Sequence, residues 1–258
     1  SPDEARTLRA TARRTWRFFE TLVGPADNHL PPDNLQEDPQ PVVAHRTSPT
    51  NMGLYLLSTI AARDLGWVGT LDTVERLEAT LASMGRLERC RGHFYNWYET
   101  RDLRPLEPRY VSTVDSGNLA GHLLVVGNAC REMLESPAGA GETLRGIEDA
   151  LLLAREAASQ LTDDRRSETV TPAHLAEALD AVAASLAPPP PPDPAEWAAR
   201  LQQLGTLADT LVDVATTFAA ERGDGEDPGV LVWARATRAA IASHRRDGDA
   251  SVPSAAAR

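Results

Sequence analysis

Apolar residues recur every three or four positions along most of the chain, which is the period of an amphipathic α-helix. In residues 3–23 one apolar stripe is expected to pack on a neighbouring element; it consists of Leu8, Ala12, Trp16, Phe19 and Val23. No stretch alternates apolar and polar residues for long enough to predict a sheet, so the expected fold class is all-α, built from helical hairpins. The predicted helices are residues 3–23, 49–66, 70–89, 116–135, 141–160, 172–187, 194–221 and 228–245.

Several predicted helices carry residues that start or end a helix. Ser48 followed by Pro49 predicts a helix start, and Gly66 can end the same helix in a left-handed conformation. Asp193 and Glu196 have the spacing of a capping box. In the helix predicted at 70–89, the stripe expected to face inward is Leu71, Val74, Leu77, Leu81 and Met84.

The segments between helices divide the chain. Residues 24–48 contain five prolines and form either an ordered or a disordered long loop. The unbroken prolines from Pro188 to Pro192 predict a short polyproline II spacer. The expected division is 1–136, 137–187 as a helical extension, 188–193 as the spacer, 194–246 as a helical hairpin, and 247–258 as a disordered tail.

Composition excludes several classes of partner. There are 37 acidic residues against 26 basic ones, all of them arginine, and the net charge of -11 argues against nucleic acid or an anionic membrane surface. No apolar run approaches the ~20 residues that a membrane span needs, so direct membrane insertion is not expected. Cys90 and Cys130 lack metal-site spacing and are expected to be free, buried thiols, with no metal and no cofactor.

The richest local chemistry is the aromatic stretch Phe94, Tyr95, Asn96, Trp97 and Tyr98. Tryptophan and tyrosine combine an apolar ring face, which stacks on a sugar, with a polar edge that bonds hydroxyl groups. The same rings could instead seal the interior of a hairpin. Composition alone leaves both interpretations open.

Carboxylates and a polar cluster flank this stretch. Glu99 and Asp115 are weak catalytic candidates, because glycoside chemistry uses two carboxyl groups at a set separation. Glu99 could equally form a solvent-exposed ion pair with Arg101 or Arg104, and Asp115 could be a helix N-cap. A second cluster suited to hydroxyl or carboxylate recognition comprises His45, Arg46 and Asn51.

Long motifs carry a specific resemblance. The stretches "WRFFETLV", "LPPDNLQEDPQPVVAHRTSPTNMGLYLLSTIAARDLGWVGT", "RLEATL", "RGHFYNWYETRDLRPLEPRYVSTVDSGNLAGHL" and "NACRE" closely resemble the middle region of the cyclic β-1,2-glucan synthases. The resemblance is dense over residues 8–135 and loose beyond. More distantly, the pattern is similar to glucoamylase-like and endo-β-1,2-glucanase domains, which are (α/α)6 barrels.

The resemblance implies a role within a much larger protein of the bacterial inner membrane, on its cytoplasmic side. There, a glycosyltransferase module makes linear β-1,2-glucan, a middle helical-barrel module cyclises it by transglycosylation, and a phosphorylase-type module trims it. Residues 1–136 look like the first part of the middle module. The segments expected to carry the family's catalytic glutamates would lie further downstream, so the chain alone is expected to bind glucan without cyclising it.

The resemblance and the residues together predict one substrate-binding surface for β-1,2-glucan. An alternative is a non-catalytic helical interaction or adaptor domain with the aromatic rings in its core, and a third is a self-sufficient glycosidase using Glu99 or Asp115. The predicted substrate-binding residues are His45, Arg46, Asn51, Tyr95, Asn96, Trp97, Tyr98, Asp115 and Asn118.

Overall fold

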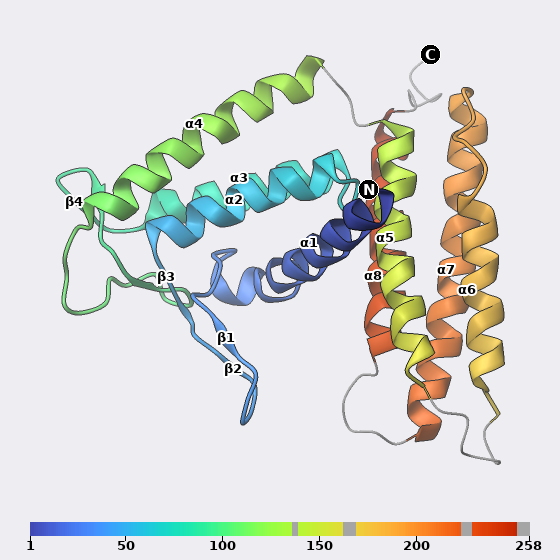
Figure 1. The fold of residues 1–258 in the computed structure, drawn as a ribbon. Coiled ribbons are helices and arrows are strands. Elements are labelled where there is room, and N and C mark those ends of the chain that lie inside the picture. Colours follow the sequence, from blue (N-terminus) through green and yellow to red (C-terminus); the bar gives the residue numbers. More distant parts are fainter. Residues whose placement is uncertain (136–138, 162–168, 223–228, 252–258) are drawn as a thin grey trace. The chain divides into compact units, whose positions relative to one another are not determined.

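The computed structural model describes residues 1–135, 139–161, 169–222 and 229–251, and within them it is predominantly α-helical (Figure 1). All eight predicted helices are present there, so the helical fold class is confirmed; no barrel is found among these residues. The helices are α1 (Pro2–Leu22), α2 (Pro49–Asp64), α3 (Thr70–Arg86), α4 (Thr113–Glu135), α5 (Ala140–Ser159), α6 (Pro172–Leu186), α7 (Pro194–Arg222) and α8 (Gly229–Ser251).

Three antiparallel ribbons of two-residue strands lie between the helices, and an all-α prediction did not include them. A strand of two residues is too short to show a period of two in the sequence. Residues 24–48 form an ordered loop, which starts with a 3-10 turn, Pro25–Asp27, and contains three of the short strands. The pairs are β1 (Leu35–Gln36) with β2 (Val42–Val43), β3 (Arg46–Thr47) with β6 (Tyr98–Glu99), and β4 (Arg89–Cys90) with β5 (His93–Phe94).

The chain forms two compact units. The bundle unit comprises Ser1–Arg13, Asp64–Leu71 and Ala138–Arg258, and the loop unit comprises Arg14–Arg63 and Asp72–Pro137. Each has its own apolar core. The bundle unit thus contains two early pieces of chain in addition to the C-terminal helices. A division of the chain at a single position would assign these pieces to the other unit.

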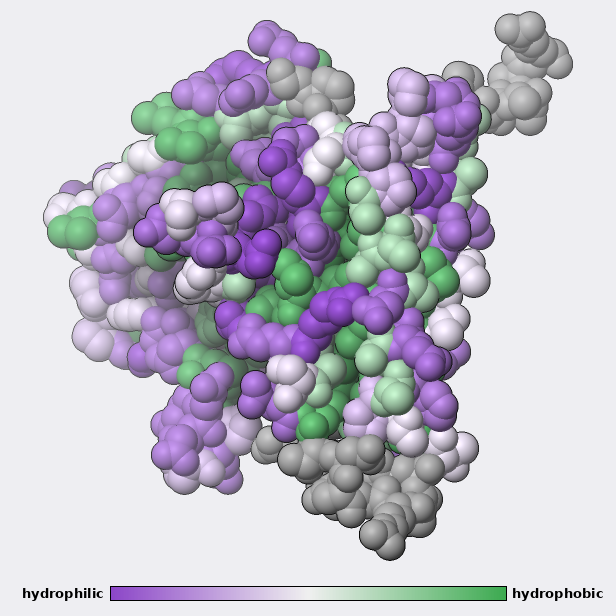
Figure 2. All heavy atoms as spheres, turned by 45° about the vertical axis from the view of Figure 1, so that its right-hand side comes forward, coloured by the Kyte–Doolittle hydropathy of each residue, from purple (hydrophilic) through white to green (hydrophobic). Residues whose placement is uncertain are grey.

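In the bundle unit, α5 contacts α6 and α8, and α7 contacts α6 and α8, so the four helices close into a bundle (Figure 1). Its core includes Leu151, Leu204, Leu211 and Phe218. On the face seen in Figure 2, apolar side chains are exposed between hydrophilic ones. The bundle is a self-contained helical core.

Polar side chains tie the earlier chain pieces to the bundle. The Arg9 Nη2 atom donates to Asp149 Oδ2 at 2.6 Å, and the Trp67 indole N–H donates to the same oxygen at 2.7 Å. Arg13 is fully buried, with its guanidinium carbon 5.8 Å from the Trp67 ring centre and 5.4 Å from that of Trp233. Contacts of this kind connect positions far apart in the sequence.

The core of the loop unit is formed by α2, α3, α4 and the ribbons, and it includes Leu30, Met52, Leu56 and Leu119. Ser48 caps α2 as predicted, since its Oγ accepts the backbone N–H of Asn51 at 3.2 Å.

Two predicted apolar stripes were partly wrong. Leu8 of α1 is 70% exposed. In α3, Leu77 and Met84 are buried as predicted, but Leu71, Val74 and Leu81 are exposed. Their place toward the core is taken by two buried threonines, Thr73 and Thr80, and the Thr80 hydroxyl donates to the His29 carbonyl at 2.8 Å.

The loop-unit helix α4 is unusual in its exposure. Of its 23 residues only Leu119 and Val126 are buried, and the exposed ones include Leu124 at 73% and Leu134 at 88%. No described helix is both long enough and apolar enough to span a membrane.

Candidate functional site

The N-terminal parts of α2 and α4 lie side by side in the loop unit. The Asn118 side-chain amide donates to the Thr50 hydroxyl at 3.2 Å. One turn further along, Gly53 lies so close to His122 that an added Cβ would be 2.2 Å from His122 Nδ1. Both contacts advance in the same direction, so the helices run parallel and their N-termini share one end, where backbone N–H groups favour oxygen-rich ligands. We call this end of the loop unit, with the ribbons around it, the loop end.

Arg46 and Trp97 lie together on one side of the β3–β6 ribbon. The Arg46 guanidinium carbon is 4.8 Å from the centre of the Trp97 ring. Its Nε and Nη2 atoms donate to Asp33 Oδ2 at 3.1 and 2.8 Å. The other Asp33 oxygen, Oδ1, accepts from the Asn51 amide at 3.2 Å. Asp33 thus bonds two predicted site residues, Arg46 and Asn51, and Trp97 joins them by packing on Arg46. Asp33 lies in the proline-rich stretch before α2 and was not among the predicted site residues.

Asn96 joins the aromatic stretch to α4. It is 6% exposed. With its amide oriented to match its neighbours, the oxygen accepts from Trp97 Nε1 at 2.9 Å and from the Tyr110 hydroxyl at 2.8 Å, and the nitrogen donates to Asp115 Oδ2 at 2.9 Å. Asp115 lies in the first turn of α4, and the cap is Ser112, whose Oγ accepts the Asp115 N–H at 3.1 Å. The N-cap interpretation of Asp115 was therefore wrong.

Tyr98 is fully buried in the loop-unit core. Its hydroxyl donates to the Glu88 carbonyl at 2.7 Å and accepts the Tyr95 N–H at 2.7 Å. Burial raises the Tyr98 pKa from 10.0 to about 12. The prediction that Tyr98 stacks on a ligand is corrected, because no face of its ring is exposed. Tyr95 and Trp97 are only partly buried, so the aromatic stretch both fills the core and reaches the surface.

His45 lies on the other side of the same ribbon from Arg46, as alternate strand residues do. Its Nδ1 atom is 2.7 Å from Asp27 Oδ1, and the Thr100 hydroxyl donates to that same oxygen. Asn28, at φ 51°, donates to the Thr100 and Arg101 carbonyls at 2.8 and 2.9 Å. Asp27 was missed because nothing in the sequence shows that it meets residues as distant as Thr100.

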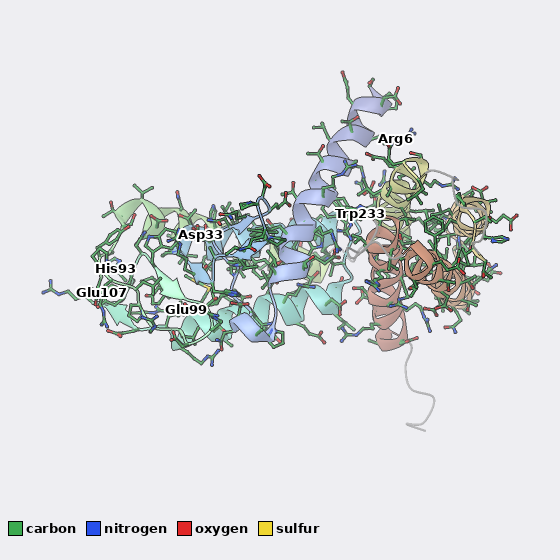
Figure 3. The ribbon with its side chains drawn as sticks, turned by 90° about the horizontal axis from the view of Figure 1, so that it is seen from below. Arg6, Asp33, His93, Glu99, Glu107 and Trp233 are labelled. Carbon is green, nitrogen blue, oxygen red and sulfur yellow. The ribbon has the colours of Figure 1, made fainter. Side chains whose placement is uncertain are left out.

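The two catalytic candidates have separate partners. Glu99 Oε1 accepts from Arg101 Nε at 2.9 Å, whereas Arg104 bonds Asp102 instead. Figure 3 shows Glu99 and Asp33 in the loop unit, with His93 and Glu107 toward one end of it. Asp115 Oδ2 instead accepts from the Asn96 amide, so each of the two candidate carboxylates has its own partner.

The remaining residues with possible site chemistry are metal-ligand types and the two cysteines. No group of three or more His, Cys, Asp or Glu residues able to hold a metal ion occurs in the part of the chain that the structure describes. Cys90 and Cys130 are free, but Cys90 is only partly buried and Cys130 is exposed, so the expectation of buried thiols was wrong. Neither residue is an inert core thiol.

A groove of about 650 Å³ lies in the bundle unit between α5, α6 and Pro188–Pro190. Its lining is largely apolar, with Arg145, Glu148 and Arg155 among the lining residues. None of the predicted site residues lines it.

Comparison with known proteins gives one informative relative. No protein-family model matches the chain. Over 168 residues, 65% of the chain, the sequence is 53% identical to the cyclic β-(1,2)-glucan synthase NdvB of Rhizobium meliloti (strain 1021). The chain is homologous to part of that synthase. It spans 6% of the length of NdvB, and the relation to this family of synthases was predicted from the sequence.

Proposed function

We propose that this chain is a β-1,2-glucan-binding part of a larger cyclic β-1,2-glucan synthase, and that the glucan lies across the loop end. The observation that carries the proposal is the 53% identity to a cyclic β-(1,2)-glucan synthase over 168 residues. Identity of this degree implies that the aligned residues share their local structure with the synthase.

The geometry of the loop end supports a neutral, hydroxyl-rich ligand. Arg46 and Asn118 supply hydrogen-bond donors, and Trp97 supplies an apolar ring face. Because Arg46 covers one face of the Trp97 ring, a glucosyl unit would stack on the other. An anionic ligand fits less well, since Asp33 and Asp115 place negative charge at the same end.

The proposed residues act in two ways. Arg46, Asn51, Tyr95, Trp97 and Asn118 would contact the glucan. Four others would act mainly by holding these in place or at the edge of the surface; they are His45, Asn96, Tyr98 and Asp115.

Catalysis is proposed to require residues outside this chain. Glu99 is engaged by Arg101, and Asp115 is engaged by Asn96. A glycosidase-type acid must be free to donate a proton to the leaving oxygen, and its partner must lie at a set distance across the bond. We therefore propose that the isolated chain binds glucan without cyclising it. In the complete synthase, residues 1–136 would form part of a helical barrel on the cytoplasmic side of the inner membrane.

A second candidate is a helical interaction domain, and the bundle unit favours it. The four-helix bundle has an open, largely apolar groove of about 650 Å³, and a protein segment with an apolar face would fit there. This function would use α5 and α6 and would not need Trp97.

Calorimetric titration of the chain with linear β-1,2-glucan separates the two candidates. Wild-type protein should bind, and Trp97→Ala should weaken binding by roughly tenfold, because the stacking face is lost. Trp197→Ala, which removes a partly buried indole from α7 in the bundle unit, is the matched control and should bind as the wild type does. Absence of binding by the wild type, or equal binding by Trp97→Ala, would count against the glucan proposal at this surface.

A further inference from the structure

Asp33 forms hydrogen bonds to two residues of the loop end that are proposed to contact the glucan, Arg46 and Asn51. Its side chain is 19% exposed, and each of its oxygens has a different partner. Oδ2 accepts twice from Arg46 and once from the neighbouring Asn34 amide at 3.2 Å, and Oδ1 accepts from Asn51 in the first turn of α2. One carboxylate therefore fixes a guanidinium from the β3–β6 ribbon and an amide from a helix.

After these bonds to Asp33, one donor atom of Arg46 and one acceptor atom of Asn51 remain available for a ligand. Arg46 uses Nε and Nη2 on Asp33, its side chain is 50% exposed, and its Nη1 atom makes no hydrogen bond within the described residues. Asn51 uses its nitrogen on Asp33, which leaves its side-chain oxygen as an acceptor. Asn51 Oδ1 is not among the buried polar atoms that lack a partner, so it reaches the solvent, and the Arg46 side chain is half-exposed.

Arg46 is also held from its flat side. The Trp97 ring lies 4.8 Å from the guanidinium carbon, and an arginine over an indole gains cation–π attraction. A carboxylate at the edge and a ring at the face together restrict the guanidinium to one plane. Such restriction lowers the entropy cost of forming a further hydrogen bond.

We infer that Asp33 is a positioning residue that presents the Arg46 Nη1 donor and the Asn51 Oδ1 acceptor as a pair to hydroxyl groups of a glucan. The inference rests on the proposed function and extends it, because it states the chemistry of recognition. A donor beside an acceptor suits a hydroxyl group, which both accepts and donates. An anionic group such as a carboxylate could accept from Arg46 but has no hydrogen to donate to Asn51 Oδ1, so it would leave that acceptor without a partner.

The test uses the full chain and linear β-1,2-glucan of defined length in calorimetric titrations. Asp33→Ala should weaken binding about tenfold, because two hydrogen bonds of modest net value lose their preorganisation. Asp102→Ala is the matched control, since Asp102 is also a loop carboxylate paired with an arginine, Arg104, at 3.0 Å. It removes the same charge and should leave binding unchanged.

A double-mutant comparison separates positioning from general structural damage. If Asp33 acts through Arg46 and Asn51, then Asp33→Ala should cause no further loss of affinity in an Arg46→Ala/Asn51→Ala background. An equal tenfold loss in that background would overturn the inference. Asp33→Asn, which keeps an acceptor oxygen, should recover part of the affinity.

A measurement on the protein without glucan distinguishes the positioning role of Asp33 from the proposed binding of glucan. The NMR signal of the Arg46 Nε–H group should be protected from solvent exchange in the wild type and in Asp102→Ala, and lost in Asp33→Ala. A mobile Arg46 in the wild type would overturn the positioning role even if glucan binds. A protected Arg46 with no glucan binding would instead overturn the proposed function, and with it the glucan as the ligand of this pair.

Discussion

At the loop end, some of the site residues could be predicted from the sequence and others could not. The side chains of Arg46, Asn51 and Trp97 were selected by chemical type, and the structure places Arg46 and Asn51 on one carboxylate, with Trp97 packed on Arg46. The carboxylate itself, Asp33, was not selected, because its spacing to Arg46 and Asn51 along the chain has no helical or strand period. Its place in a proline-rich motif beside other polar residues was the available signal.

Tyr98 gives the clearest case of chemical type misleading. A tyrosine among aromatic and polar neighbours is as suited to a ligand surface as to a core. Its place is decided by pairing with β3, whose Thr47 lies opposite Tyr98 and is also buried. That pairing joins positions far apart in the chain, so the local sequence could not reveal it.

Tyr98 should make the stability of the loop unit fall in alkaline solution. Its pKa is about 12 in the folded chain and 10.0 ordinarily, so folding favours the protonated phenol. The stabilisation is complete below pH 10 and is lost as the pH rises toward 12. Two pKa units correspond to roughly 2–3 kcal/mol in the free energy of unfolding. Urea unfolding of the wild type across this pH range measures the loss.

Tyr98→Phe is the matched variant for that experiment. It loses the hydrogen bonds to the Glu88 carbonyl and from the Tyr95 N–H, so near neutral pH it should be less stable by about 1–2 kcal/mol. It has no phenol to ionise, and the difference from the wild type should therefore shrink with rising pH. A difference that stays constant up to pH 12 would show that Tyr98 is not the titrating group.

At the scale of elements, the helices were predictable and the ribbons were not. Helical periodicity and the caps at Ser48 and Thr171 are local properties of the sequence, so they set most helix bounds within a few residues. α8 is an exception, since it continues to Ser251. Which face of α3 is buried depends on its neighbours, and buried threonines there replaced three leucine and valine positions of the predicted stripe.

Close packing of α5 on the Gly66 turn is an element-scale feature with a sharp test. Gly66 has φ 79°, the left-handed conformation predicted for it. A Cβ added to Gly146 of α5 would lie 2.0 Å from the Gly66 carbonyl oxygen. Because the obstacle is backbone, it cannot rotate away, and Gly146→Ala should lower the free energy of unfolding by about 2–3 kcal/mol or more.

Gly141→Ala is the matched control in the same helix. A Cβ added at Gly141 meets nothing within 4 Å, and alanine has the higher helix propensity. This variant should be as stable as the wild type or more stable by up to about 1 kcal/mol. Thermal unfolding of both variants, followed by circular dichroism, distinguishes the close contact from a general effect of replacing glycine. Equal stability of the two variants would show that α5 does not pack this closely on the Gly66 turn.

At the scale of the whole molecule, the described residues form two apolar cores that share no residue. The core of the bundle unit includes Leu211 and Phe218, and the core of the loop unit includes Leu56 and Leu119. The sequence predicted a change near residue 136, from aromatic and chemically varied to alanine- and leucine-rich. It could not show that residues 1–13 and 64–71 belong with the later helices, because that assignment depends on contacts such as Arg9 with Asp149.

Separate cores predict separate responses to core mutations. Leu56 and Leu211 are both fully buried, and truncating either to alanine should cost about 2–5 kcal/mol in the unit that contains it. Differential scanning calorimetry of the wild type should resolve two transitions. Leu211→Ala should lower the temperature of one and Leu56→Ala that of the other. Binding of β-1,2-glucan should raise only the transition that Leu56→Ala lowers, since the ligand is proposed to bind the folded loop unit. A single transition lowered equally by both variants would instead mean that the two cores unfold as one cooperative unit.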